Sequence, residues 1–502
     1  DLRMTGKRHP YSSDFKIGLT KAGKILAYEV TFYQNAGAAA DLSPAVLGRT
    51  LFHTTNSYYI PNVKATGLSC KTNLPPNTAF RGFGGPQAMF VMEAAIYKAA
   101  CKMGIDPVII QKKNLLKEND EFPYGQKAER SQAVRCWETA EALYNIHEIK
   151  QKIKEFNRTN ILYKKGIAMM PVCFGISFTN TFMNQASTLV HIYSDGSVSI
   201  STAAVEMGQG VNSKLRYIAS KILSINIDRI KIETTNTTRV ANSSPTAASA
   251  STDLNGKAVE IACNILLERL RNVAAEELQL NQDQKNQLKE EEIFVDNSPS
   301  GLKWEKLISF AIFKRTNLSA QAQYATPGIY FDKEKSKGNA FAYHSYGTAI
   351  IETTVDCLRG TYVIDSVKVV HDFGTSFDET IDRGQAEGAI LQGIGWMTLE
   401  EIIYDENGKL ITDALSTYKI PDIYSVPQHV EIHFLKDSKN PMGILNSKAI
   451  GEPPLMYGIG SFFAIMNAIK EFRSEEHFNF SAPFTNEKVL LSLYSKVKKL
   501  EV

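Results

Sequence analysis

The sequence predicts an α+β fold, because strand-forming and helix-forming stretches alternate irregularly instead of in a repeating βα order. Stretches such as residues 25–33 alternate apolar and polar side chains, which is typical of half-buried strands. Other stretches space apolar residues as a helix does, for example Val211, Leu215, Ile218 and Ile222. A length of 502 residues fits two or three ordinary domains or one very large one. We expect a domain boundary near residue 165.

The first expected domain comprises residues 1–150. Residues 15–34 predict two strands around a Lys-Ala-Gly-Lys turn. Residues 86–103 predict a helix, because Pro86 suits a first helical turn, where its missing N–H costs nothing. The polar residues 104–165 predict two helices and a linker.

The second expected domain comprises residues 166–475, and residues 476–502 are expected to form a peripheral tail. The expected elements of this domain are a hairpin turning at Asp195-Gly196, a helix from 211, a helix over 256–277, a solvated segment over 280–292, a hairpin turning at Arg359-Gly360, a helix that RGQAEG opens and that runs to about 403, and a helix over 454–473.

Composition excludes several classes of function. A net charge of +3 over 502 residues is too small to indicate binding to nucleic acid or to a membrane surface, and no run of 18 apolar residues is present. The six cysteines include no C-x-x-C pair, and no H-E-x-x-H occurs, so we expect no metal held by protein nitrogen or sulfur. Scattered cysteines and the missing signal pattern predict a cytoplasmic protein, with peroxisomal delivery left open. The start DLRMTGKRHP predicts a piece of a longer polypeptide or one subunit of a split enzyme.

Four glycine-rich segments are predicted to open onto helices: AFRGFGGPQ, VEMGQG, RGQAEG and SKAIGEPPL. Free N–H groups at a helix start can bind an anion, and glycine lets a ligand approach the backbone. Neither the dinucleotide-binding G-x-G-x-x-G context nor a phosphate-binding P-loop is present. In the last segment Gly451, Pro453 and Pro454 surround a single carboxylate, Glu452. The two prolines restrict the backbone there, so this side chain can be aimed at one point.

The ordered motifs NTAFRGFGGPQ, FGISFTNTFMNQ, VEMGQG, NSSPTAASASTD, STYKIP and SKAIGEPPL closely resemble the molybdenum-cofactor region of xanthine dehydrogenases and oxidases. The resemblance covers roughly residues 3–475. It implies an α+β fold of two molybdopterin-binding domains, the first one truncated, with the cofactor between them. The family's second substrate-binding glutamate, in an FGGK-type loop, would lie before residue 1, so the pocket is expected to be incomplete.

The resemblance also implies which residues contact the cofactor. In the family, molybdenum is held by the dithiolene of the pterin and not by protein side chains. Arg81 and Ala248 match cofactor-contacting positions, and Gln209 and Gln385 match loops along the pterin, whose edge suits an amide that donates and accepts. The alternative for the two glutamines is capping of their own loops.

Glu452 matches the family's general base. The resemblance implies that it takes a proton from a molybdenum-bound hydroxyl, that the oxygen attacks an electrophilic carbon of the purine, and that hydride passes to a terminal sulfido ligand. The neighbouring helix start favours an anion. The alternative is that Glu452 merely caps that helix.

Substrate contacts follow from the same resemblance. Phe83 and Phe178 match two rings that sandwich the substrate, and Thr179 matches a hydroxyl that hydrogen-bonds the purine. Ala247, with Ala248, would leave room beside the metal. The alternatives are ordinary core packing for the two phenylalanines and simple packing of small residues for the alanines.

Arg49, in DLSPAVLGRTLFH, sharpens the prediction of substrate. It matches an arginine that xanthine-converting members direct at the purine oxygen and that aldehyde-oxidising relatives lack. A guanidinium in a dry site would stabilise negative charge on the ring. The alternative is a surface arginine paired with an acid such as Asp41.

The resemblance therefore predicts molybdenum-dependent hydroxylation of hypoxanthine to xanthine to urate, a step of purine catabolism. One alternative is an aldehyde oxidase-like activity on aldehydes and N-heterocycles, and another is a non-catalytic module that binds purine or pterin. FAD and 2Fe-2S clusters are expected in other parts of the same chain or in separate subunits, with NAD or oxygen as final electron acceptor. The family also predicts a homodimer.

Overall fold

The computed structural model describes residues 2–473 and 479–494. The first part of the chain contains β1 (Tyr11–Leu19), β2 (Ile25–Gly37), α1 (Ser43–Phe52), β3 (Val63–Lys71), α2 (Gly85–Met103), α3 (Pro107–Asn114), α4 (Ala133–Tyr144) and α5 (Ile146–Thr159). The middle part contains β4 (Tyr163–Ile176), η1 (Thr181–Met183), β5 (Gln185–Ile192), β6 (Val198–Thr202), α6 (Val211–Leu223), η2 (Ile227–Arg229), β7 (Ile230–Ile232), α7 (Ser251–Glu277), β8 (Asn286–Lys289), β9 (Glu292–Val295), β10 (Ser298–Lys303), α8 (Trp304–Phe313) and β11 (Ser319–Ala325). The last part contains β12 (Tyr343–Asp356), β13 (Thr361–His371), α9 (Glu379–Thr398), α10 (Leu415–Tyr418), η3 (Ile423–Ser425), β14 (His429–Phe434), η4 (Ile444–Asn446), η5 (Pro453–Gly458), α11 (Ile459–Phe472) and α12 (Asn486–Tyr494).

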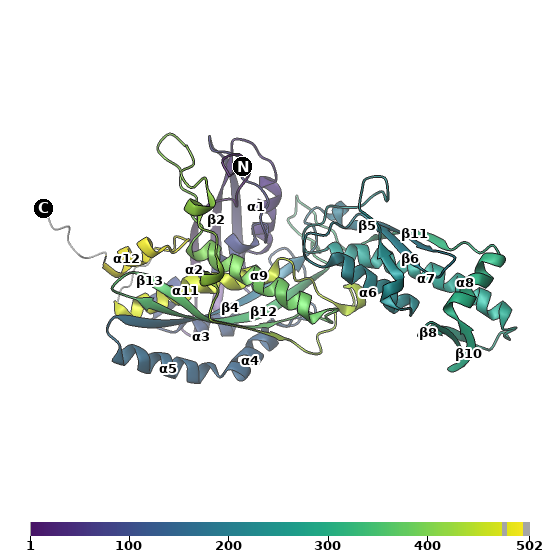
Figure 1. Ribbon diagram of the computed structural model, residues 1–502. Helices are drawn as coiled ribbons and strands as arrows, with labels where there is room; N and C mark the ends of the chain where they lie inside the picture. Colours follow the sequence, from purple (N-terminus) through teal and green to yellow (C-terminus); the bar gives the residue numbers. More distant parts are fainter. Residues whose placement is uncertain (1, 474–478, 495–502) are drawn as a thin grey trace.

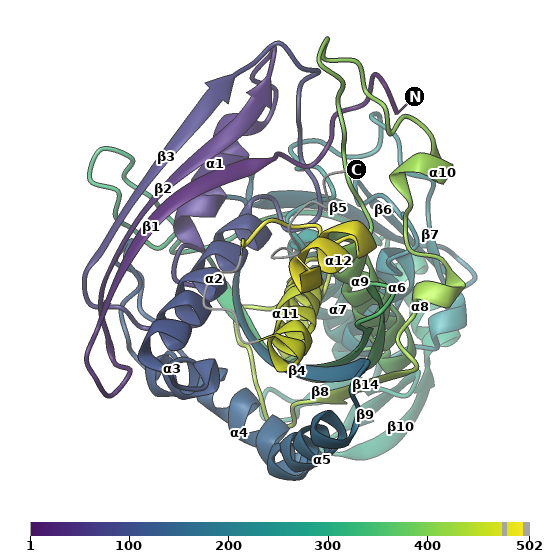
Figure 2. The same ribbon diagram turned by 90° about the vertical axis from the view of Figure 1, so that its left-hand side faces the viewer.

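The central sheet has the strand order β14-β13-β12-β4 and is buried on both faces. Successive residues of β4 point to opposite sides, as strand geometry requires. Ala168, Met170 and Val172 enter the core that contains α11, whereas Met169 and Cys173 enter the core that contains α4. Figure 2 shows α11 near the middle of the molecule, with β4 curving beside it.

Two further sheets flank this centre. The sheet β1-β2-β3 contains the hairpin predicted over 15–34, and α1 and α2 pack near it. The sheet β11-β5-β6-β7 packs on α6 and α7 around a separate core and lies at the opposite end of the molecule from α12 (Figure 1). The predicted hairpins at Asp195-Gly196 and Arg359-Gly360 are confirmed as β5–β6 and β12–β13. No helix among the described residues combines the length and the apolar character needed to cross a bilayer.

Several predicted elements are wrong. The segment expected to be solvated starts a small three-stranded sheet, β8-β9-β10, because Leu288 and Ile293 are buried. The polar region 104–165 contains three helices instead of two. The predicted peripheral tail packs on the core through Phe484, Val489 and Leu493, while residues 476–478 and 495–502 lie outside the described part.

The RGQAEG segment is not a loop before a helix. It occupies residues 383–388, inside α9, whose N-terminus is capped by Asp378 through the backbone N–H groups of Thr380 and Ile381. Because those residues are already helical, their N–H groups are not the free donors of a helix start. The segment therefore presents a helix face to the site instead of a phosphate-binding turn.

The helix α9 touches the η5 turn main chain to main chain. A Cβ on Gly393 would lie 2.0 Å from the carbonyl oxygen of Leu455, and a Cβ on Gly458 would lie 2.3 Å from the carbonyl carbon of Gly393. Both glycines are needed for this approach, since real Cβ contacts are longer. The turn that follows Glu452 is thus fixed directly on α9.

Candidate active site

The carboxylate of Glu452 joins three distant segments of the chain. Its Oε1 accepts the backbone N–H of Gly82 at 3.2 Å, and its Oε2 accepts the hydroxyl of Ser249 at 2.9 Å. Glu452 occupies the N-cap position of η5, yet its side chain makes no capping hydrogen bond. The helix-capping alternative is therefore wrong, and the half-buried carboxylate points at the glycine turn around Gly82.

Arg81 connects this turn to α9. Its Nε donates to the carbonyl oxygen of Gly451, its Nη1 donates to Oε1 of Gln392 at 3.3 Å, and its Nη2 reaches the carbonyl oxygen of Gln385 at 3.5 Å. Arg8 supports Arg81 from behind by donating to its carbonyl oxygen at 2.9 Å. The guanidinium of Arg81 thereby fixes the loop of Glu452 relative to α9.

Three buried or partly buried arginines interact electrostatically with the negative charge of Glu452. Burial lowers the pKa of Arg8 to about 10 and also lowers the pKa of Arg49 and of Arg81. In each case the charge of Glu452 opposes this decrease. The carboxylate consequently lies in a cationic surrounding, which suits an anionic base or an anionic transition state.

The VEMGQG loop reaches the site from the side of α6. Gln385 donates from Nε2 to the carbonyl oxygen of Gly208 at 3.2 Å, which places this loop beside α9. The amide of Gln209 bonds within its own loop, since its Nε2 donates to Val205 O at 2.7 Å and its Oε1 accepts Met207 N–H. Gln209 thus shows the loop-capping arrangement, and its contact with a cofactor stays a prediction.

The N–H groups of this loop are already occupied. The carboxylate of Glu206 accepts the backbone N–H groups of Gly208 and Gly210 at 2.9 Å each and that of Asn212 at 3.0 Å. Burial opposes ionisation of Glu206, but these hydrogen bonds outweigh it and lower its pKa. The expected free anion site at the start of α6 is therefore filled by a side chain of the chain itself.

Arg49 lies in the interior, 1% exposed, on α1. Its Nη1 donates to the carbonyl oxygen of Gly175 at 2.9 Å, its Nη2 donates to that of Ser177, and its guanidinium lies 5.0 Å from the Phe174 ring and 5.3 Å from the Phe341 ring. The alternative of a surface arginine paired with Asp41 is wrong. Arg49 instead fixes the end of β4, immediately before Phe178.

The other substrate candidates surround the same region. Phe83 follows Gly82 with a φ of 50°, and the backbone of Phe178 is held by Asn184, whose Oδ1 accepts its N–H at 2.8 Å. Both rings are half-buried, and they do not contact each other among the described ring pairs, so the sandwich stays a prediction. Thr179 and Ala248 are half-buried, whereas Ala247 is exposed.

The residues present fit a cofactor that brings its own metal ligands. A Cβ at Gly208, Gly384 or Gly388 would meet nothing within 4 Å, so this side of the loop and of α9 borders open space. The described residues include no group of three or more His, Cys, Asp or Glu side chains that could hold a metal. Arg81 bonds Gly451 O and reaches the carbonyl oxygen of Gln385, and Ala248 directly precedes Ser249, so the three residues come from segments that meet near Glu452.

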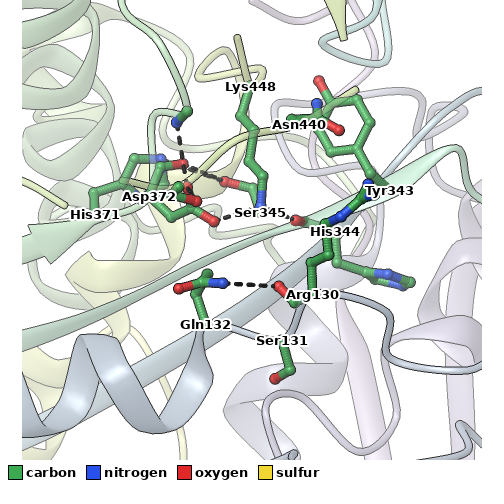
Figure 3. A network of polar contacts seen from close by, with 12 residues as sticks. Arg130, Ser131, Gln132, Tyr343, His344, Ser345, His371, Asp372, Asn440 and Lys448 are labelled. Atoms are coloured by element: carbon green, nitrogen blue, oxygen red, sulfur yellow. Dashed lines mark hydrogen bonds and ion pairs between the residues drawn. The ribbon is translucent and has the colours of Figure 1, made fainter. Parts of the chain in front are cut away.

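Sequence reasoning missed Ser249 and the interior pair behind the loop. Lys448 donates from Nζ to Oδ2 of Asp372 and to the carbonyl oxygen of His344, and Ser438 donates to Oδ1 of Asp372 (Figure 3). Lys448 belongs to SKAIGEPPL, but nothing in that motif indicates its partner. Ser249 gave no signal either, because serine is common in loops.

Comparisons with known proteins identify the class that this fold and site define. The chain belongs to the molybdopterin cofactor-binding domain family, which it matches over residues 1–115 and 139–427. It is 42% identical over 496 residues to the xanthine dehydrogenase/oxidase of Felis catus and 38% identical over 499 residues to the xanthine dehydrogenase of Dictyostelium discoideum. These alignments cover 97% and 98% of this chain but only 36% and 35% of the relatives, so the chain spans about a third of their length.

Solved structures agree on the fold. Quinoline 2-oxidoreductase from Pseudomonas putida has a TM-score of 0.86 at 21% identity, over 98% of this chain and 63% of that one. Aldehyde oxidoreductase from Desulfovibrio desulfuricans has a TM-score of 0.82 at 23% identity, over 98% of this chain and 50% of that one. The expected α+β fold of two molybdopterin-binding domains and the expected molybdopterin cofactor are confirmed.

Proposed function

We propose that this chain is the molybdenum-site portion of an enzyme that hydroxylates purines, converting hypoxanthine to xanthine and xanthine to urate. The observation that carries the proposal is the Glu452 carboxylate, held by Gly82 and Ser249 where the cofactor-facing segments meet. Similarity to xanthine dehydrogenases over 97% of the chain supports the choice of substrate class.

The cofactor, when bound, supplies the oxygen transfer and accepts the electrons of the oxidation. Arg81, Ala248, Gln209 and Gln385 are the residues that would hold it. Arg81 already bonds the loop of Glu452 and α9, so it sets the distance between the base and the helix face. Gln209 would act through the shape of its loop, which its amide holds by bonding Val205 O and Met207 N–H.

Glu452 acts as general base. One of its oxygens accepts a proton as the oxygen nucleophile adds to a ring carbon, while the bonds from Gly82 and Ser249 keep the carboxylate in place. General bases typically contribute about 10²–10⁴-fold to rate. The three surrounding arginines balance the negative charge that the reaction develops.

The purine lies between Phe83 and Phe178, with Thr179 as a hydrogen-bonding partner and Ala247 leaving space. A flat heterocycle gains about 0.5–1.5 kcal/mol from such stacking beyond the burial of its area. Arg49 directs its charge toward the purine oxygen. Its guanidinium is buried away from water, where a fixed cation stabilises a developing negative charge most strongly.

The rest of the enzyme is part of the same proposal. Because the xanthine dehydrogenase relatives are almost three times as long, we place the 2Fe-2S clusters and FAD in other parts of the same chain or in separate subunits. A homodimer with NAD or oxygen as final acceptor completes the proposal.

The test compares two substrates in the assembled enzyme. Arg49→Met is expected to lower turnover of hypoxanthine relative to benzaldehyde by about 10²–10³-fold, the usual cost of one donor to a developing anion. The substitution also removes the Arg49 donors from Gly175 O and Ser177 O, so part of the protein can fail to fold. Loss of folded protein lowers both rates equally, so the ratio of hypoxanthine turnover to benzaldehyde turnover reports the effect on substrate alone. An unchanged ratio contradicts the purine proposal and favours an aldehyde oxidase-like activity.

Molybdenum analysis of the purified parent enzyme separates catalysis from simple binding. We expect about one molybdenum per chain, as one cofactor site per chain requires. A pure, folded protein without molybdenum and without turnover of either substrate contradicts the proposal and favours the non-catalytic module.

A further inference from the structure

We propose that Ser249 is a positioning residue, which holds the carboxylate of Glu452 in its working orientation. This inference rests on the proposed function, because it concerns the same base. Ser249 donates from Oγ to Oε2 at 2.9 Å, while Gly82 N–H donates to Oε1 at 3.2 Å. Each oxygen of the carboxylate therefore has one fixed partner and keeps a lone pair for a proton.

The donors on the two oxygens fix the plane of the Glu452 carboxylate. A backbone N–H can only donate, so the bond from Gly82 requires an acceptor at Oε1. A hydroxyl that donates to a charged carboxylate makes one of the stronger hydrogen bonds. Without the hydroxyl of Ser249, the carboxylate keeps only the bond from Gly82 and can rotate about it.

The backbone around Ser249 has an unusual conformation. Ala248 and Ser249 have φ values of 54° and 56°, two consecutive residues in the left-handed region that glycine adopts most easily. Strain of this kind persists where the surrounding contacts determine the conformation. A side chain at position 451 would crowd Ser249, since a Cβ on Gly451 would lie 2.9 Å from Ser249 Oγ. The hydroxyl of Ser249 thus occupies the space that glycine at position 451 leaves free.

Two substitutions separate the hydroxyl from the backbone. Ser249→Ala removes the donor and keeps the strain, whereas Ser249→Gly removes the donor and relieves the strain, so this variant should fold at least as well as the parent. Ser251→Ala is the matched control, because its hydroxyl lies two residues further on, at the start of α7, and bonds Asn255 instead of Glu452.

Two measurements on the assembled enzyme follow the effect. Infrared difference spectra against Glu452→Gln identify the carboxylate stretching band of Glu452, whose position depends on the hydrogen bonds to its oxygens. The second measurement separates kcat from KM. In both Ser249 variants we expect the band to shift and kcat to fall by about tenfold with KM unchanged, as expected for loss of one hydrogen bond to a charged group. The control should match the parent.

The outcomes distinguish this inference from the proposed function. If Ser249 only shapes the turn, Ser249→Gly keeps the parental band and kcat, and the inference is overturned. If the parent enzyme turns over no purine, the proposed function fails, whereas the infrared spectra still decide whether Ser249 holds the carboxylate of Glu452.

Discussion

Lys448 bonds Asp372 in the interior, where their side chains are 4% and 0% exposed. Lys448 lies four positions before Glu452 in the chain, and the backbone N–H of Ala449 donates to the hydroxyl of Tyr343 at 2.9 Å. The loop that presents Glu452 is therefore anchored on the central sheet before it reaches the site. Figure 3 shows the pair beside His344 and Ser345, at the start of β12.

Breaking this pair should destabilise the protein severely. Lys448→Met leaves the buried Asp372 carboxylate without its cation, which typically costs about 3–5 kcal/mol. Urea unfolding followed by circular dichroism measures the loss. The matched control is Lys314→Met, which breaks a surface pair with Glu276 and should cost about 1 kcal/mol or less. Equal effects of the two substitutions would contradict an anchoring role for Lys448.

Glu452→Gln should abolish turnover without unfolding the site. Glutamine keeps the size of the side chain, and its carbonyl can still accept Gly82 N–H, so thermal stability should change little. The rate should fall by more than about 10⁴-fold, above the usual range for a general base, because Glu452 also generates the nucleophile in the proposed mechanism. Steady-state kinetics measure the loss. The control is Glu401→Gln, which loses an ion pair with Lys488 outside the site and should keep parental turnover.

Gly384→Ala should stabilise the protein and weaken cofactor binding. Gly384 is inside α9, and a Cβ there meets nothing within 4 Å, so the helix should gain about 0.5–1 kcal/mol. In the proposed arrangement the same methyl group lies on the face of α9 that borders the cofactor, so molybdenum content should decrease. Gly48→Ala in α1 is the control, because its Cβ also meets nothing, and it should leave molybdenum content unchanged. Normal metal content in Gly384→Ala would place the cofactor elsewhere.

Glu93 should make stability depend on pH. Burial raises the pKa of this carboxyl from 4.5 to about 7, despite hydrogen bonds from Tyr58, Gln111 and Asn56 that oppose the rise. A raised pKa in the folded state means that the acid form stabilises the fold. The contribution of protonated Glu93 to the free energy of unfolding is complete below pH 4.5. About 3 kcal/mol of this stability is lost as the pH rises through 7.

The comparison of Glu93→Gln with the parent isolates this effect from the buried histidines. The difference in unfolding free energy between the two proteins should change in favour of the variant from pH 5 to about pH 7 and then level off toward pH 8. Unfolding in urea at each pH measures it. A constant difference would mean that Glu93 does not titrate in this range.

Local pattern predicted much of the fold. The hairpins at Asp195 and Arg359 and the helix over 86–103 followed from period and turn chemistry, which act over a few residues. The small sheet β8-β10 was missed, because Leu288 and Ile293 are buried by tertiary packing within a polar stretch. The packing of α12 was missed for the same reason, since its partners lie far away in the chain.

The site was predicted in part. The motif around Glu452 indicated a fixed carboxylate, and the structure shows it bound on both oxygens. RGQAEG was misread as a turn, because glycine within a helix gives the same local signal as a glycine loop. The partners Ser249 and Asp372 are 203 and 76 positions from Glu452 and Lys448, so no local pattern could join them.

The contact between Gly393 and Gly458 adds a main-chain constraint to the side-chain contacts of Arg81 and Lys448 that hold the loop of Glu452. At this contact no rotamer change can alter the separation between the turn and α9, because neither glycine has a side chain. A single added methyl group there forces the two elements apart and shifts the acid with them. These two positions therefore accept glycine alone.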